Sequence, residues 1–164
     1  ITGASKQSEN GKYLFKVPAG IALSVDAKSP FANEDIRVNN MGSELEIKTM
    51  NGDIYLEAIT GPAVISTMNG NVEATFNKVN QDNPSSITSM NGHIDITIPS
   101  NTPAELKMSS MNGQVFTNFD ITFGKEKNDM KYIGGGKDVP GQINGGGVKI
   151  SLTSMNDNIY LRKK

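Results

Sequence analysis

A short motif that returns at nearly regular intervals constrains the fold of this chain more than any other feature. Thr49-Met50-Asn51-Gly52-Asp53-Ile54 recurs with few changes at residues 67–72, 89–94, 110–115 and 154–159, and a degenerate copy covers residues 33–36. The asparagines of successive copies are 18, 18, 22, 21 and 44 residues apart. Such periods are typical of repeat architectures. The last step is twice 22, which predicts one disguised copy within residues 120–147.

Each copy joins two short segments with the alternation of strands. Leu45 and Ile47 precede the first full copy, and Ile54 and Leu56 follow it. Period-two alternation predicts strands with one buried face. The same pattern places equivalent residues inward in the later copies, down to the pairs Val115/Thr117 and Ile159/Leu161. The chain is rich in turn formers, with 17 glycines and 7 prolines, and no stretch has the apolar spacing of an amphipathic helix.

Two all-β folds fit this pattern. In one, Asn-Gly is the two-residue turn of a β-hairpin; in the other, each copy is one coil of a solenoid whose equivalent residues stack about 4.8 Å apart. A hairpin needs only the turn dipeptide, whereas the Thr/Ser and Met columns recur as well, and stacked asparagines can bond to one another. We therefore predict a right-handed single-stranded β-helix of about seven coils, with an irregular loop near 120–147. The predicted handedness follows from the general preference of parallel crossover connections for a right-handed path. The alternative is an antiparallel hairpin-based sandwich. The expected organisation is a flexible segment 1–12 followed by a single β-solenoid domain 13–164.

Composition excludes several classes of function. Lys and Arg number 16 against 17 Asp and Glu, for a net charge of -1, which argues against a nucleic-acid partner. Cysteine is absent, so disulfides, thiolate metal sites and cysteine nucleophiles are excluded. No apolar run has the length of a transmembrane segment. Residues 1–12 lack the regions of a signal peptide, so the expectation is either a cytosolic chain or one whose export signal precedes Ile1.

The repeat resembles a bacterial family classed as adhesins, which is built from an all-β repeat of roughly twenty residues with a Gly-Asp motif. The resemblance rests on residues 45–54 and their later copies, on the opening segment 15–21 and on the ending 145–159, and it covers about residues 13–162. Only Gly52 is followed by Asp; the later copies carry Asn71, His93 and Gln114 instead. The resemblance implies a β-helical fold and export to the bacterial cell envelope or surface.

Little in the sequence indicates catalysis. His93 is the only histidine and occupies a variable, outward position of the repeat, so we interpret it as a surface residue rather than a general base or metal ligand. Glu57, Glu73 and Asp95 lie in or near one outward strand face, which keeps a carbohydrate-active lyase or hydrolase as the alternative function. We expect no enzyme activity, no metal site and no cofactor.

Two outward columns are candidates for binding. Tyr55, Phe116 and Tyr160 share one column with Glu73 and Asp95, and exposed aromatic rings can stack on sugars or anchor proteins. A second column consists of Met50, Met68, Met90, Met111 and Met155. These residues alternate with the inward Thr/Ser positions, so they are also expected to point outward. The leading hypothesis is a non-enzymatic envelope or surface scaffold, an adhesin that binds an unidentified protein or carbohydrate through its extended surface.

Overall fold

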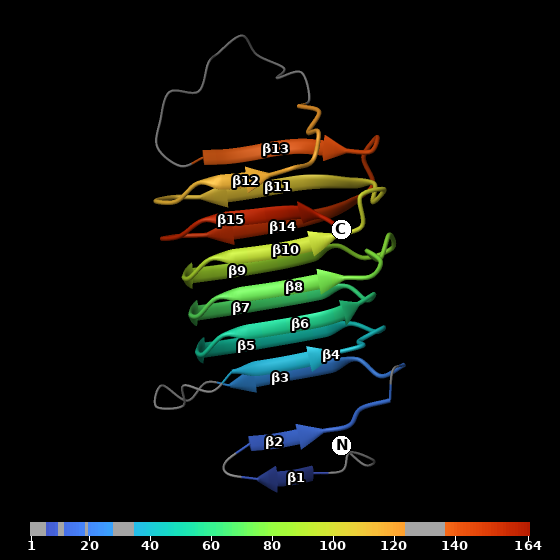
Figure 1. Ribbon diagram of the computed structural model, residues 1–164, viewed down its shortest axis with the longest axis vertical. Coiled ribbons are helices and arrows are strands. Elements are labelled where there is room, and N and C mark those ends of the chain that lie inside the picture. The colour runs from blue at the N-terminus through green and yellow to red at the C-terminus, as the bar shows by residue number, and fades with distance from the viewer. Residues whose placement is uncertain (1–5, 10–11, 19, 28–34, 124–136) are drawn as a thin grey trace.

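The computed structural model describes residues 6–9, 12–18, 20–27, 35–123 and 137–164, and all regular elements in these ranges are strands. Two sheets lie against each other along the whole stack (Figure 1). The seven-stranded sheet contains, in spatial order, β13 (Lys137–Ile143), β11 (Ala104–Ser110), β14 (Val148–Ser154), β9 (Ser85–Asn91), β7 (Ala63–Asn69), β5 (Leu45–Asn51) and β3 (Leu23–Ala27). The six-stranded sheet contains β12 (Val115–Thr117), β15 (Ile159–Lys163), β10 (Ile94–Ile98), β8 (Val72–Phe76), β6 (Ile54–Ile59) and β4 (Ile36–Asn39).

The strands that flank each Asn-Gly do not pair with each other. β5 pairs in parallel with β3 and β7, whereas β6, which follows the turn, pairs in parallel with β4 and β8 in the other sheet. Each coil thus consists of two strands, one from each sheet, and the coils stack on one another. This arrangement confirms the solenoid-like prediction and contradicts the hairpin-based sandwich.

The core lies between the two sheets and consists of the inward residues that the alternation predicts. The pairs Leu45/Ile47, Ile54/Leu56, Ile94/Ile96, Leu106/Met108, Ile150/Leu152 and Ile159/Leu161 are all buried. The prediction is wrong at β12, where Val115 is only half-buried and Thr117 is exposed. β12 is the last strand of its sheet, so it has a neighbouring strand on one side only.

The motif is a stacking device at the corner between the sheets. The Thr/Ser side chains face inward, and the three serines donate to carbonyls of the neighbouring coil; Ser89 Oγ, for example, donates to the Gly70 carbonyl at 3.0 Å. Thr49 Oγ1 donates to the Asn51 carbonyl of its own coil, and the buried Thr67 Oγ1 has no hydrogen-bond partner within the described residues. A Cβ on Gly70 would lie 2.1 Å from the Gly52 oxygen, so the close approach of the coils requires glycine there.

The motif asparagines form a ladder in which each Nδ2 donates to the Oδ1 of the asparagine on the next coil. The distances are 3.0, 2.8, 2.6 and 2.7 Å along the spatial order Asn51, Asn69, Asn91, Asn156 and Asn112. The bonds between stacked asparagines are therefore confirmed. The order of the ladder differs from the order of the sequence, because Asn156 lies between Asn91 and Asn112.

The coil formed by β14 and β15 is inserted between two coils that are consecutive in sequence. β14 pairs in parallel with both β9 and β11, and β15 pairs in parallel with both β10 and β12. In Figure 1 the red strands β14 and β15 accordingly lie between the green-yellow β9 and β10 and the yellow β11 and β12.

Contacts outside the strands hold the inserted coil. Asn144 adopts a φ of 50°, and its Nδ2 donates to the carbonyls of Ser100 and Thr102 at 3.0 and 2.7 Å. These carbonyls belong to the connection between β10 and β11. Gln81 Oε1 accepts a bond from the Val148 backbone at 3.3 Å. The inserted coil is thus attached to connections on both sides of it.

The predicted irregular loop near 120–147 is wrong over part of its length. Residues 137–143 form β13, which pairs antiparallel with β11 and is not the disguised parallel coil that the spacing predicted. β13 contains Pro140, and because β13 is the last strand of its sheet, its edge position tolerates a proline. Residues 124–136 of the predicted loop lie outside the described residues.

The N-terminal part forms a separate two-stranded sheet. β1 (Lys6–Glu9) and β2 (Lys12–Phe15) pair antiparallel. The domain boundary predicted at residue 13 therefore falls inside β2, and residues 6–9 of the segment predicted to be flexible lie in a strand. Flexibility itself stays a prediction.

Candidate functional site: the outer face of the six-stranded sheet

The predicted aromatic column exists and crosses the whole sheet. Strand register places Arg37, Tyr55, Glu73, Asp95, Tyr160 and Phe116 side by side on β4, β6, β8, β10, β15 and β12. Tyr160 and Phe116 are neighbours, and their rings stack at 5.2 Å between centroids with an interplanar angle of 11°. Tyr55 is separated from them by the strands that carry Glu73 and Asp95. The structure therefore brings together two of the three predicted binding residues and places the third apart.

The aromatic pair has cationic and imidazole neighbours. The Arg162 guanidinium lies 5.2 Å from the centroid of the Tyr160 ring, and His93 meets the same ring edge-on at 6.4 Å. Phe116 is 44% exposed. This end of the face thus offers an accessible flat ring beside a planar cation, a combination that suits stacking contacts.

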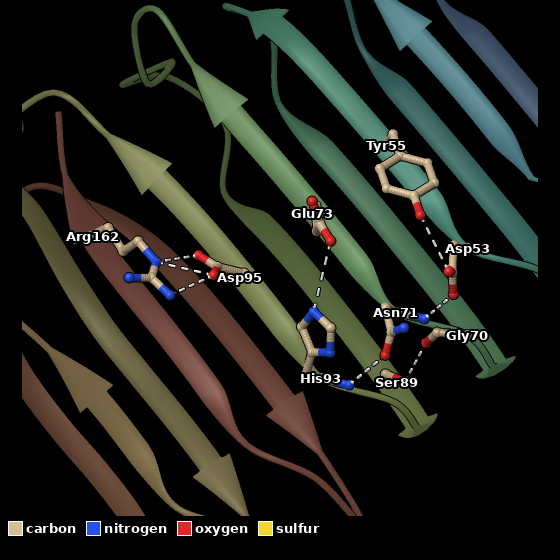
Figure 2. A network of polar contacts seen from close by, with 9 residues as sticks. All are labelled: Asp53, Tyr55, Gly70, Asn71, Glu73, Ser89, His93, Asp95 and Arg162. Carbon is tan, nitrogen blue, oxygen red and sulfur yellow. Dashed lines mark hydrogen bonds and ion pairs between the residues drawn. The ribbon is translucent and has the colours of Figure 1, made fainter.

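Tyr55 occupies a different, more acidic setting. The Arg37 guanidinium lies 4.0 Å from the centroid of the Tyr55 ring, and the Tyr55 hydroxyl donates to Asp53 Oδ2 at 3.3 Å (Figure 2). Partial burial, together with the Asp53 charge and hydrogen bond, raises the pKa of Tyr55 above its usual value. The phenol therefore stays protonated and acts as a hydrogen-bond donor.

Asp95 is held by an ion pair that crosses two distant parts of the sequence. The Arg162 guanidinium donates three hydrogen bonds to its carboxylate, at 2.7, 2.9 and 2.7 Å. Figure 2 shows this pair beside Glu73 and His93, whose Oε1 and Nε2 atoms are 3.8 Å apart. The Asp95 hydrogen bonds raise the pKa of Arg162, which is charged at neutral pH in any case. Asp95 is thus engaged by Arg162 and not presented as a free acid or base.

A groove of about 360 Å³ runs along this face between the two ends. The lining consists of Arg37, Asn39, Tyr55, Leu56, Glu57, Glu73, Ala74, Thr75, Asp95, Thr97 and Arg162. β6 has a bulge here, after Leu56, and Ala58 adopts a φ of 55°. Bulges bend a strand and redirect its side chains, so Glu57 leaves the regular register at the edge of the groove.

The aspartate or asparagine that precedes this column has a structural role. Asp53 Oδ1 accepts the backbone N–H of Asn71 at 2.7 Å, and Asn71 Oδ1 accepts that of His93 at 3.1 Å (Figure 2). His93 itself is partly buried, with a side-chain exposure of 32%. Within the described ranges, no three side chains of His, Cys, Asp or Glu gather closely enough to hold a metal ion.

The sequence interpretation missed the two arginines of the site. Arg37 follows the degenerate copy, so aligning Ile36 with Ile54 would have placed it beside Tyr55. Arg162 could not be placed in this way, because its contact with Asp95 depends on the inserted coil. In the described part of the chain, no helix is long and apolar enough to span a membrane.

Comparison with known proteins agrees with this architecture. No curated protein and no solved structure matches the chain. The sequence profile of one family, Toastrack DUF4097, matches residues 23–162, which covers both large sheets from β3 to β15. The fold independently shows repeats that build an all-β, solenoid-like scaffold. The chain therefore belongs to the Toastrack DUF4097 family.

Proposed function

We propose that this protein is a non-enzymatic scaffold of the bacterial cell envelope, an adhesin that binds a protein or carbohydrate through the outer face of its six-stranded sheet. The observation that carries the proposal is the outward-facing column from Tyr55 to Phe116, in which Glu73 and Phe116 are exposed and the other members half-buried, with the groove beside it. An open face with aromatic rings and paired charges suits binding by area. Export to the envelope or surface is supported by the resemblance of the repeat.

The contacts of the groove favour binding over catalysis. A general acid or base must be able to gain and lose a proton at the reacting atom, but the Asp95 carboxylate accepts three hydrogen bonds from Arg162. A carbohydrate-active lyase or hydrolase is the second candidate, because Glu73 and Asp95 lie opposite each other on neighbouring strands. The two functions differ in whether a bound polysaccharide is cleaved.

The test uses a panel of bacterial, plant and host polysaccharides and envelope proteins. We expect measurable binding without release of reducing ends or unsaturated products. Phe116→Ala should weaken binding about fivefold, since stacking on one ring contributes roughly 1 kcal/mol. Val64→Ala is the matched control, because Val64 is a similarly exposed apolar residue, at 39%, on the other sheet.

Two results would count against the proposal. Equal binding by the wild type and Phe116→Ala would remove the aromatic column from the binding face. Turnover that disappears in Asp95→Asn or Glu73→Gln would establish the enzyme instead. Fractionation of the source cells tests localisation: recovery of the protein in the cytosol alone would exclude the envelope.

Finer features of the winding belong to the same proposal. We infer a right-handed solenoid of about seven coils, and the general handedness of parallel crossovers supports the winding direction. Within the described residues, six coils have one strand in each large sheet, and β13 adds a seventh strand, antiparallel, to the larger sheet. An experimental structure provides the test, and left-handed crossovers between β5, β6 and β7 would contradict the inference.

A further inference from the structure

The methionine column lies on the outer face of the other sheet and is not used by the proposed binding face. Met50, Met68 and Met90 lie in β5, β7 and β9, whereas Met155 and Met111 directly follow β14 and β11; each methionine precedes the ladder asparagine of its coil. Register pairs on either side keep them level: Thr67 pairs with Ser89 and Asn69 with Asn91. One thioether is therefore presented by each of five adjacent coils.

These side chains are accessible. Met68, Met90 and Met155 are 40%, 39% and 40% exposed, and Met111 at the end of the column is 61% exposed. Met50 is half-buried. The remaining described methionines, Met41 and Met108, are buried in the core. Four of the five methionines of the column are thus exposed, and the chain has buried methionines for comparison.

The described surroundings of the column are almost uncharged. On one side lies the asparagine ladder, whose amides bond to one another. On the other side the register places a second column, which consists of Ser109, Thr153, Thr88, Ser66 and Lys48. The same column continues with Asp26 on β3 beyond Lys48 and with Asp138 on β13 beyond Ser109, and the Lys48 ammonium is paired with Glu46 at 2.6 Å. Beside the central methionines Met68, Met90 and Met155, however, the two columns carry only amides and hydroxyls, and not the carboxylates that hard divalent cations require.

Thioethers are neutral, soft ligands that select soft metal ions such as Cu(I). Neighbouring strands are about 4.8 Å apart, and a metal–sulfur bond is about 2.3 Å long. A cation midway between two thioethers on adjacent coils can therefore reach both. Methionine has three rotatable bonds, which allows a third sulfur from the next coil to approach.

We propose that the methionine column binds a soft monovalent cation, Cu(I) or its redox-stable analogue Ag(I), with Met68, Met90 and Met155 at its centre. The inserted coil completes this site, because Met155 directly follows β14 and the next residue, Asn156, donates its backbone N–H to the Met90 carbonyl at 3.2 Å. The assignment can be tested cleanly, since the chain has no cysteine and its one histidine, His93, follows the turn at the start of the other sheet.

The experiment is a titration of Ag(I) nitrate, in chloride-free buffer, into protein labelled with ¹³C at the methionine methyl groups. We expect the signals of Met68, Met90 and Met155 to shift, and those of buried Met41 and Met108 to stay in place. Calorimetry of the triple variant Met68→Leu, Met90→Leu and Met155→Leu should show affinity reduced at least about tenfold, since leucine conserves volume but has no sulfur.

Controls make each outcome decisive. Unchanged Met41 and Met108 signals in the triple variant show that the fold is retained, and His93→Ala should bind Ag(I) like the wild type. A Cu(I) titration under anaerobic, reducing conditions should shift the same three methyl signals. The proposal is overturned if the column signals do not move with either ion, if the triple variant binds as well as the wild type, or if His93→Ala abolishes binding.

Discussion

The inserted position of β14 can be tested by cross-linking, because the natural chain has no cysteine to interfere. Thr88 on β9 is in register with Thr153 on β14, which is in register with Ser109 on β11. Cα atoms in register on adjacent strands are about 5 Å apart, and atoms two strands apart are about 9.6 Å apart. A disulfide requires a Cα separation of about 4.4–6.8 Å. Thr88→Cys with Thr153→Cys should therefore oxidise to an internal disulfide, whereas Thr88→Cys with Ser109→Cys should not.

The stabilisation expected from the first pair follows from the loop that it closes. Joining residues 88 and 153 restricts the unfolded chain by roughly 4 kcal/mol, which corresponds to a rise in Tm of about 8–16 °C. Non-reducing electrophoresis, mass spectrometry and thermal unfolding with and without reductant measure both quantities.

The pair Thr153→Cys with Ser109→Cys is the control for oxidation, since these residues are adjacent even if the coils stack in sequence order. Formation of the 88–109 disulfide in place of the 88–153 disulfide would refute the inserted order. Equal amounts of both would show that the chain populates two orders.

Three further predictions address the core, the phenol and the corner. Ile96→Ala should lower the free energy of unfolding by about 2–5 kcal/mol, because Ile96 is 1% exposed between Ala74 and Leu161. His93→Ala should change it by no more than about 0.5 kcal/mol. Equal losses in a denaturant titration would show that the assignment of Ile96 to the inner face and His93 to the outer face is wrong. Since the pKa of Tyr55 is raised in the folded state, the stability that the protonated phenol contributes is complete below about pH 10 and is lost as pH rises through the folded pKa. In unfolding titrations at rising pH, the free energy of unfolding should fall more steeply in the wild type than in Tyr55→Phe. Parallel profiles would contradict this. Gly92→Ala should lower the free energy of unfolding by about 2 kcal/mol or more, because its Cβ would lie 2.2 Å from the Gly70 oxygen. Gly20→Ala, which has open space at its Cβ, should change this free energy by no more than about 1 kcal/mol. Similar values for the two variants would mean that the coils can separate at the corner.

Much of the fold could be predicted because its determinants are local and repeated. Alternation identified Ile54, Leu56, Ile94 and Ile96 as inward residues, since successive side chains of a strand point to opposite faces. The repeat predicted which residues share a column, so Tyr55, Phe116 and Tyr160 were correctly placed on one face and the asparagines in one ladder. The failures lie at ends and edges: Thr117 is exposed because β12 has one neighbour, and 137–143 is a strand because the edge of a sheet accepts Pro140.

The order of the coils was decided only by the tertiary structure. The five full copies share the Thr/Ser, Met and Asn columns, and four of them share the glycine that Asp157 replaces in the last copy. The shared columns let coils stack on one another but do not specify which copy is the neighbour of which. Contacts outside the motif make that choice: Asn144 bonds to the connection before β11, and Gln81 bonds to the start of β14. The Asp95–Arg162 pair and the Met90–Met155 neighbours depend on this choice. Local sequence therefore determined the form of each coil and the residues on each face, whereas long-range contacts determined which faces became continuous.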